Sequence, residues 1–266
     1  MSYKELSSAS NPKILLYKKL NSSKQFREKQ GKIALEGPNL IREALKKGLQ
    51  PEFIFFTTGY PESAGGSWVK EVPPSTRLYQ VNEQLFNKIA LTEKPQPVAA
   101  VFYYNPLESP DHGVIKQELI ILLEELQDPG NLGTIIRTAA AAGADTIYYT
   151  GGCADPFGPK ALRASAGSIF SLKVEFVHQP LRLICSLKEK GLTAIAAVAH
   201  GGMAYYDADF RRPVVLFIGN EAGGLSPELA EAANYKVTIP LQSNVESLNA
   251  AVAAGIILFE IANRDS

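Results

Sequence analysis

Cysteine is scarce in this chain of 266 residues. The two cysteines, Cys153 and Cys185, lie far apart and form no Cys-x-x-Cys pattern. We therefore expect neither a disulfide framework nor a thiolate metal site. The three histidines, at positions 112, 178 and 200, include no pair with metal-ligand spacing, so no metal is expected at all.

Long apolar runs are also missing. No segment has the roughly 20 apolar residues that a membrane-spanning helix needs, and residues 1–13 lack the apolar stretch of a signal peptide. We therefore expect a cytoplasmic protein with no membrane partner. The formal net charge is zero, which argues against a general binder of polyanions.

Positive charge is nevertheless concentrated near the N-terminus. Between Lys13 and Lys32 seven basic residues accompany a single acid, Glu28. The stretch predicts a polar helical segment that is broken near residues 21–23. By itself it is as compatible with a solvated helix surface as with an RNA-binding face.

A composition of 45% hydrophobic and 20% charged residues is that of a globular protein, and the length suits two domains. Residues 105–113 (NPLESPDHG) contain two prolines, a glycine and acids that cannot continue a helix or strand. We predict a domain at residues 1–104, a linker at 105–113 and a second domain at 114–266. Strands expected at 33–35, 52–57, 77–81 and 98–104 alternate with helices in the first domain, which indicates a small α/β layer.

The second part of the chain alternates strands and helices without interruption. Strands are expected at 119–123, 146–150, 172–177, 193–198, 214–218 and 236–239, and helices at 132–142, 161–168, 181–190, 227–233 and from residue 250 onward. This order predicts an α/β fold with a mostly parallel sheet that is covered on both faces. Ligands of such sheets bind at the carboxyl ends of the strands.

Polar residues follow two of these strands. After the first strand, Asn131 is a helix-capping type and Arg137 can bind phosphate through its planar fork. After strand 214–218, Gly219 and Gly224 permit a tight loop, and Glu221 lies between glycines where it cannot pack. Each feature alone also has an ordinary explanation, a surface salt bridge for the first and a solvated glycine-rich turn for the second.

A third polar loop precedes the C-terminal helix. Ser247 and Asn249 are good N-cap residues, and the run of small residues from Ala250 onward has strong helix propensity. The following residues are apolar on almost every face, so this helix needs burial on more than one side. No Gly-x-Gly-x-x-Gly follows a strand, so a Rossmann-type cofactor site is not supported.

Together the three loops resemble the motifs of the SpoU/TrmH family of RNA 2′-O-ribose methyltransferases, members of the SPOUT class. The matching stretches are Asn131-x-Gly133-x-x-x-Arg137, Gly219-x-Glu221-x-x-Gly224, and Ile239-Pro240 with Ser247-Leu248-Asn249. The resemblance spans residues 115–264. In addition, residues 32–43 (KIALEGPNLIRE) resemble the start of the ribosomal-protein-like substrate-binding domain of many members.

The resemblance implies a small N-terminal α/β substrate-binding domain, a C-terminal α/β domain with a trefoil knot, and a homodimer. It implies methyl transfer from S-adenosylmethionine to a ribose 2′-hydroxyl of ribosomal or transfer RNA, with ribosomal RNA preferred. The catalytic residues that it implies are Arg137, Glu221, Ser247 and Asn249. The residues implied for the cofactor are Gly219, Asn220, Gly224, Ile239, Leu241 and Leu248. Those expected at the RNA are Asn131, Arg137, Lys24, Arg27 and Lys32.

The resemblance places Arg137 at the 2′-hydroxyl and the adjacent phosphate. Because a guanidinium stays protonated in ordinary protein settings, we expect Arg137 to stabilise the forming alkoxide and not to act as the base. Ser243 departs from the family, in which glycine is common at this position, and could narrow the adenosine loop. The alternatives are an RNA-binding protein that keeps the fold without catalysis, which the presence of all four catalytic residues disfavours, and a nucleotide-binding oxidoreductase of the doubly wound class.

Overall fold

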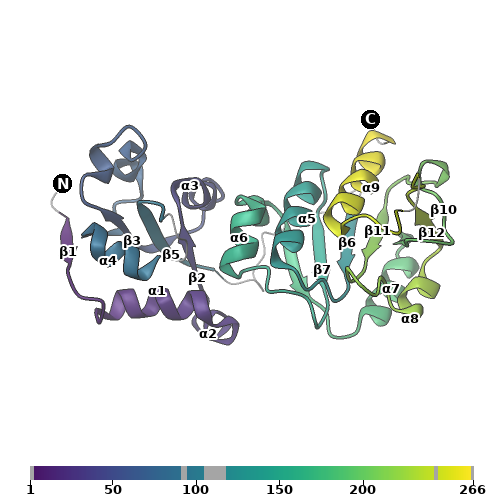
Figure 1. Ribbon diagram of the computed structural model, residues 1–266, viewed down its shortest axis with the longest axis horizontal. Helices are drawn as coiled ribbons and strands as arrows, with labels where there is room; N and C mark the ends of the chain where they lie inside the picture. Colours follow the sequence, from purple (N-terminus) through teal and green to yellow (C-terminus); the bar gives the residue numbers. More distant parts are fainter. Residues whose placement is uncertain (1–2, 91–94, 105–117, 243–244, 265–266) are drawn as a thin grey trace.

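A computed structural model describes residues 3–90, 95–104, 118–242 and 245–264. Figure 1 shows two lobes side by side, an N-terminal one in purple and blue and a C-terminal one in teal to yellow, and each lobe is built on its own β-sheet. The predicted linker and Ser243 lie outside the described residues. The exact division of the chain therefore stays a prediction.

The N-terminal lobe contains a five-stranded mixed sheet in the order β1-β4-β3-β5-β2, in which β5 runs antiparallel to β2 and β3. Its strands are β1 (Lys4–Leu6), β2 (Lys32–Glu36), β3 (Pro51–Thr57), β4 (Arg77–Val81) and β5 (Val98–Tyr103). Its α-helices are α1 (Pro12–Ser22), α2 (Lys24–Gln30), α3 (Pro38–Lys46) and α4 (Glu83–Ile89). The predicted break falls at Ser23, whose hydroxyl accepts from the Phe26 N–H and caps α2.

The C-terminal lobe contains a seven-stranded sheet in the order β10-β12-β9-β11-β6-β7-β8, and every pairing is parallel. Its strands are β6 (Leu119–Leu123), β7 (Thr146–Tyr149), β8 (Lys173–Phe176), β9 (Thr193–Ala197), β10 (Met203–Ala204), β11 (Val214–Ile218) and β12 (Tyr235–Thr238). Its α-helices are α5 (Pro129–Ala141), α6 (Pro159–Ser165), α7 (Pro180–Glu189), α8 (Pro227–Ala232) and α9 (Ala250–Arg264). The predicted parallel α/β sheet is confirmed.

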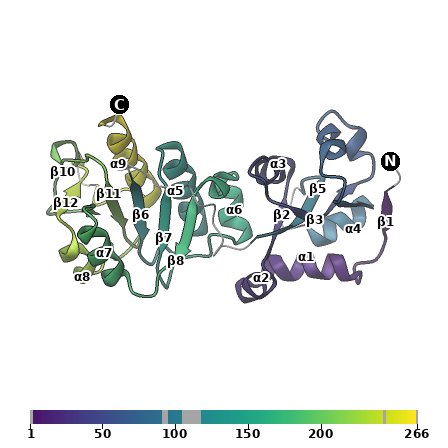
Figure 2. The ribbon, with the colours of Figure 1, turned by 180° about the vertical axis from the view of Figure 1, so that it is seen from behind.

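Helices cover both faces of this sheet, as Figures 1 and 2 show. One buried cluster joins α5, α6 and α9 to the sheet, and a second joins α7 and α8 to its opposite face. The central strands β6 and β11 are buried along their whole length, which explains their unbroken apolar sequences. None of the helices in the described ranges is long and apolar enough to cross a membrane.

The two loop-to-helix junctions near the predicted site differ in their capping. Asp128 caps α5, because its Oδ1 accepts from the Asn131 N–H at 2.7 Å. The expectation that Asn131 caps this helix is wrong, and the Asn131 side chain is left for other contacts. Asn249 caps α9, since its Oδ1 accepts from the N–H groups of Ala251 and Val252.

Candidate active site

A cavity of about 340 Å³ opens at the carboxyl ends of β9, β11 and β12. Open α/β sheets bind ligands at this edge, and the volume lies in the range of small-molecule sites. The walls come from the loop after β11, the segment after β12 and the start of α9. The lining includes all six residues predicted for the cofactor, namely Gly219, Asn220, Gly224, Ile239, Leu241 and Leu248.

The loop after β11 folds back over Gly219. Asn220 and Gly224 exchange two backbone hydrogen bonds of 2.9 Å. A Cβ on Gly219 would lie 2.2 Å from the carbonyl carbon of Gly224, whereas a Cβ on Gly223 would meet nothing within 4 Å. The missing side chain at position 219 therefore lets the loop close.

The chemistry of this lining suits S-adenosylmethionine, the cofactor that the resemblance implies. Backbone groups, small residues and apolar side chains can hold a flat base and a ribose. Among the described lining residues, Glu221 is the only charged one, and its sign is opposite to that of a sulfonium. The residues present therefore fit this cofactor.

Glu221, Asn131 and Asn249 form a chain of hydrogen bonds at the rim of the cavity. Asn131 donates from Nδ2 to Glu221 Oε1 at 3.1 Å, and Asn249 donates from Nδ2 to Asn131 Oδ1 at 2.9 Å. The backbone N–H groups of Gln127 and Asp128 also donate to the Glu221 carboxylate, each at 3.3 Å. The structure thus brings together the three loops that were singled out in the sequence.

Of the four predicted catalytic residues, Glu221 and Asn249 belong to this hydrogen-bond network, and Ser247 lines the cavity. Arg137 stands apart from them. It is exposed, forms no hydrogen bond or ion pair with any described residue, and lies six residues beyond Asn131, about 9 Å along the helix axis. Within one chain, Arg137 is therefore not part of the network.

Known proteins share this architecture. Residues 118–259 match the model of the SpoU rRNA Methylase family, and residues 11–100 match that of the MRM3-like substrate binding domain. The chain belongs to the SpoU rRNA methylase family.

Relatives match along nearly the whole chain. A tRNA/rRNA methyltransferase of Synechocystis is 36% identical over 96% of this chain and 92% of its own length. The 23S rRNA (guanosine(2553)-2'-O)-methyltransferase RlmP of Bacillus subtilis is 33% identical over 97% of this chain and 99% of its own length. The SpoU methyltransferase AviRb from Streptomyces viridochromogenes, solved in complex with AdoMet, superposes with a TM-score of 0.86 at 28% identity, covering 96% of this chain and 98% of that one.

These matches confirm the family and the fold class predicted from the sequence. They also exclude the oxidoreductase alternative. The trefoil knot and the roles of individual residues stay predictions.

The pKa of the Glu221 carboxyl group is set by opposing effects. Desolvation raises it, but hydrogen bonds from Asn131 and from the backbone N–H groups of Asp128 and Gln127 outweigh this effect and hold the pKa below its usual value of 4.5. A carboxyl group with a lowered pKa stabilises the folded SpoU enzyme above pH 4.5, and this contribution is lost as the pH falls through the lowered pKa.

We expect Glu221→Gln to be less stable than the wild type at neutral pH. Its amide NH2 group would face the N–H donors of Asn131, Gln127 and Asp128, which need an acceptor. The difference should disappear at a pH below the lowered pKa, where the wild-type side chain is itself protonated. Urea unfolding of both proteins at the two pH values measures this. If the two proteins differed in stability by the same amount at both pH values, the Glu221 carboxyl group would not be ionised as assigned.

Sequence reasoning missed one wall of the cavity. Ala197, Val198 and Ala199, at the end of β9, line it, and the Thr238 hydroxyl donates to the Ala199 carbonyl at 2.7 Å. These residues follow an apolar strand but carry no polar motif. Only the order of the sheet, which puts β9 between β11 and β12, places them here.

The basic residues predicted for RNA are less available than expected. Arg27 is only 8% exposed and is paired with Asp155 of the C-terminal lobe, called the catalytic lobe from here on because it contains the cavity. Lys32 pairs with Glu52 at 2.8 Å, and Lys24 lies over two aromatic rings of the catalytic lobe. The exposed basic side chains that remain on α1 and α2 include Lys18, Lys19 and Lys29.

No group of metal-ligating side chains is present in the described part of the chain.

Proposed function

We propose that this SpoU family member methylates ribose 2′-hydroxyl groups of ribosomal RNA. RNA 2′-O-ribose methyltransferase activity with S-adenosylmethionine as cofactor follows from the family to which the chain belongs. The observation that carries the proposal is the cavity at the carboxyl edge of the sheet, with the Glu221–Asn131–Asn249 chain at its rim. The names of RlmP and of other relatives specify ribosomal RNA, which supports ribosomal over transfer RNA.

The six lining residues predicted for the cofactor would hold it through their backbone groups and apolar side chains. When bound, S-adenosylmethionine supplies a methyl group activated by its positive sulfur. The Glu221 carboxylate would complement that charge, and its three hydrogen bonds from Asn131, Gln127 and Asp128 fix its direction. The hydrophobic walls would exclude water from this side.

For the RNA, Asn131, Asn249 and Ser247 would orient the target ribose, because their side chains lie at or beside the rim. Arg137 would bind the neighbouring phosphate in its planar fork and stabilise negative charge on the oxygen that loses its proton. A free, exposed guanidinium suits this role. It has no competing partner among the described residues.

A homodimer would supply Arg137 to the cavity of the partner subunit. Val252 and Phe259 lie seven residues apart on one face of α9 and are 51% and 46% exposed. This helix packs on α5, since a Cβ on Gly255 would touch Thr138. Pairing through this face would bury the two apolar side chains and bring Arg137 of α5 into the interface.

We expect Phe259→Glu to convert a dimer into single chains of 28.8 kDa and to reduce methyl transfer strongly, because a buried charge disfavours the interface. Size-exclusion chromatography with light scattering measures the mass. Leu181→Glu is the matched control, since Leu181 is 42% exposed on the opposite side of the sheet. A Phe259→Glu protein that remains dimeric and active would contradict this interface.

The test of the proposed function uses purified protein, labelled S-adenosylmethionine, and separate preparations of ribosomal and transfer RNA. We expect label on ribosomal RNA at a ribose 2′-oxygen, detected as a bond that resists alkaline hydrolysis. Label on transfer RNA alone would show that the substrate is transfer RNA and not ribosomal RNA. Absence of transfer to either RNA would instead support the non-catalytic alternative. The cytoplasmic location expected from the sequence stays a prediction.

A further inference from the structure

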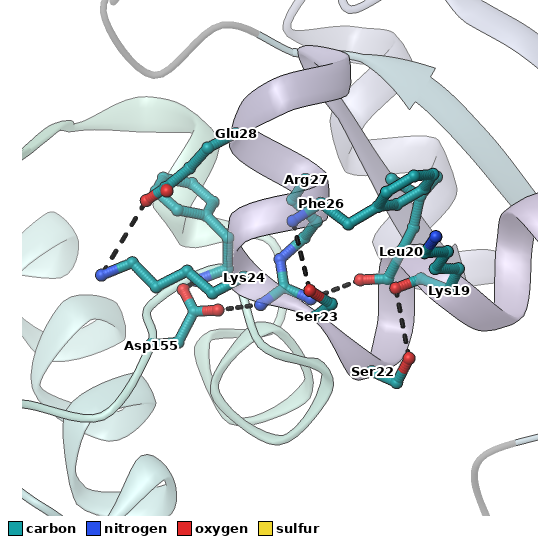
Figure 3. A network of polar contacts seen from close by, with 10 residues as sticks. Lys19, Leu20, Ser22, Ser23, Lys24, Phe26, Arg27, Glu28 and Asp155 are labelled. Carbon is teal, nitrogen blue, oxygen red and sulfur yellow. Dashed lines mark hydrogen bonds and ion pairs between the residues drawn. The ribbon is translucent and has the colours of Figure 1, made fainter.

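A largely buried ion pair links the N-terminal lobe to the catalytic lobe. Arg27 on α2 donates from Nη2 to Asp155 Oδ2 and from Nη1 to the backbone carbonyl of Leu20, as Figure 3 shows. The two side chains are 8% and 20% exposed. Burial lowers the pKa of Arg27, and a charge buried in this way is costly without an opposite charge beside it. The pair therefore differs from an ordinary surface salt bridge.

Aromatic side chains surround the pair. Lys24 places its Nζ 5.4 Å from the centre of the Tyr149 ring and 5.2 Å from that of Phe176. Tyr104, just beyond β5, has its ring centre 4.8 Å from that of Phe157. Lys24 and Tyr104 come from the N-terminal lobe and the other three rings from the catalytic lobe. Cation–π and ring contacts of this kind reinforce the ion pair.

A separate contact joins α3 to the catalytic lobe. Gly167, with φ of +87°, lies so close to α3 that a Cβ there would be 2.7 Å from the Cβ of Glu43 and 3.7 Å from Leu40 Cδ1. One buried cluster accordingly contains residues of both lobes. Contacts at several separate points restrict rotation of one lobe against the other, which a single contact would not do.

Asp155 also lies next to the active-site loops. The backbone N–H of Ala154 donates to the carbonyl of Leu126 at 2.8 Å. The two residues that follow Leu126 donate their backbone N–H groups to the Glu221 carboxylate. The loop that receives Arg27 is thus hydrogen-bonded to the loop that holds Glu221.

We propose that Arg27 and Asp155 are positioning residues for methyl transfer, which set the orientation of the N-terminal lobe relative to the cavity. RNA held by the N-terminal lobe is thereby presented with its target ribose at the Glu221–Asn131–Asn249 chain. This role rests on the proposed function. It takes the place of the direct contact with RNA that was expected of Arg27 from the sequence. Misplacement of a reacting group by about 1 Å can lower a rate by about 100-fold, so lobe orientation matters for the reaction.

The test compares full-length wild type with Asp155→Asn. Asparagine keeps the Oδ1 that accepts from the Phe157 N–H at 3.0 Å, so the local turn is preserved, while the negative charge and the oxygen that accepts from Arg27 are lost. Lys88→Gln is the matched control, because it removes an exposed positive charge from α4 of the same lobe without touching the pair. We measure kcat and KM for ribosomal RNA, the Kd for S-adenosylmethionine, and the radius of gyration by small-angle X-ray scattering.

We expect Asp155→Asn to lower kcat/KM for RNA about tenfold or more, to increase the radius of gyration and to leave the cofactor Kd unchanged. Arg27→Lys keeps the charge but loses the fork that serves Asp155 and Leu20 together, so it should show a smaller loss in the same direction. Arg27→Gln combined with Asp155→Asn should cost little more than either alone, since one interaction is removed in each case.

Opposite results would overturn the proposal. If Arg27 were instead a phosphate ligand masked by Asp155, Asp155→Asn would free it and lower the KM for RNA. An unchanged kcat/KM and radius of gyration, or an equal loss in Lys88→Gln, would also reject it. Should wild type transfer no methyl group to RNA, the proposed function fails, and the scattering comparison alone still decides whether the pair holds the lobes together.

Discussion

Replacing Arg137 by alanine should lower kcat for methyl transfer about 100- to 1,000-fold, the loss typical when a group that stabilises a developing oxyanion is removed. The fold should be unaffected, because Arg137 is exposed and contacts no described residue through a hydrogen bond or ion pair. Steady-state transfer of labelled methyl groups to ribosomal RNA measures the loss. Unfolding in urea verifies that stability is unchanged.

Arg182→Ala is the control for this experiment, since it removes an exposed arginine from α7, on the other face of the sheet. It should retain wild-type kcat. Mixing inactive Arg137→Ala with inactive Asn249→Ala chains should restore activity if subunits exchange, because one site of the mixed dimer then has both groups. Methylation that persists in Arg137→Ala would defeat the assigned role.

Gly219→Ala should abolish cofactor binding and destabilise the fold by about 1–3 kcal/mol, the cost of overpacking a tight site. The added Cβ would overlap the Gly224 backbone and would force open the pair of hydrogen bonds between Asn220 and Gly224. Isothermal calorimetry with S-adenosylmethionine measures binding, and urea unfolding measures the stability.

Gly223→Ala provides a matched control in the same loop. A Cβ there meets nothing within 4 Å, and no left-handed φ is present, so the fold should tolerate it. If this variant binds the cofactor more weakly, the cause would be the added methyl group on the cavity side of the loop, because the loop itself still closes. Equal binding by the Gly219→Ala and wild-type proteins would contradict the role assigned to loop closure.

Local pattern predicted most of the fold. The apolar runs gave β6 and β11 at their observed bounds, because a strand buried on both faces must be apolar throughout. The local pattern did not predict β1 and β10, because these strands have only three and two residues, too few to show an alternation of apolar and polar side chains. The capping of α5 was assigned to Asn131, since both Asp and Asn suit an N-cap and the sequence does not fix the first residue of a helix.

The candidate site divides in the same way. The resemblance to the SpoU/TrmH family named all six predicted cofactor residues that line the cavity, together with Glu221 and Ser247. Sequence reasoning placed Arg27 on an exposed basic face, whereas the structure buries it against Asp155, 128 residues away. The charge of α2 is visible in the sequence, but its surroundings depend on which lobe surface packs against it.

The sequence by itself determined the order of strands and helices, the three polar loops and the family. Each of these depends on residues close together in the chain or on the spacing of a motif. Only the tertiary structure decided the sheet order that puts β9 beside the cavity, the hydrogen bonds that join Asn131 to Glu221 and Asn249, and the contact between lobes. Such contacts arise from the packing of surfaces made by distant segments, and no local pattern of residues specifies which surfaces meet.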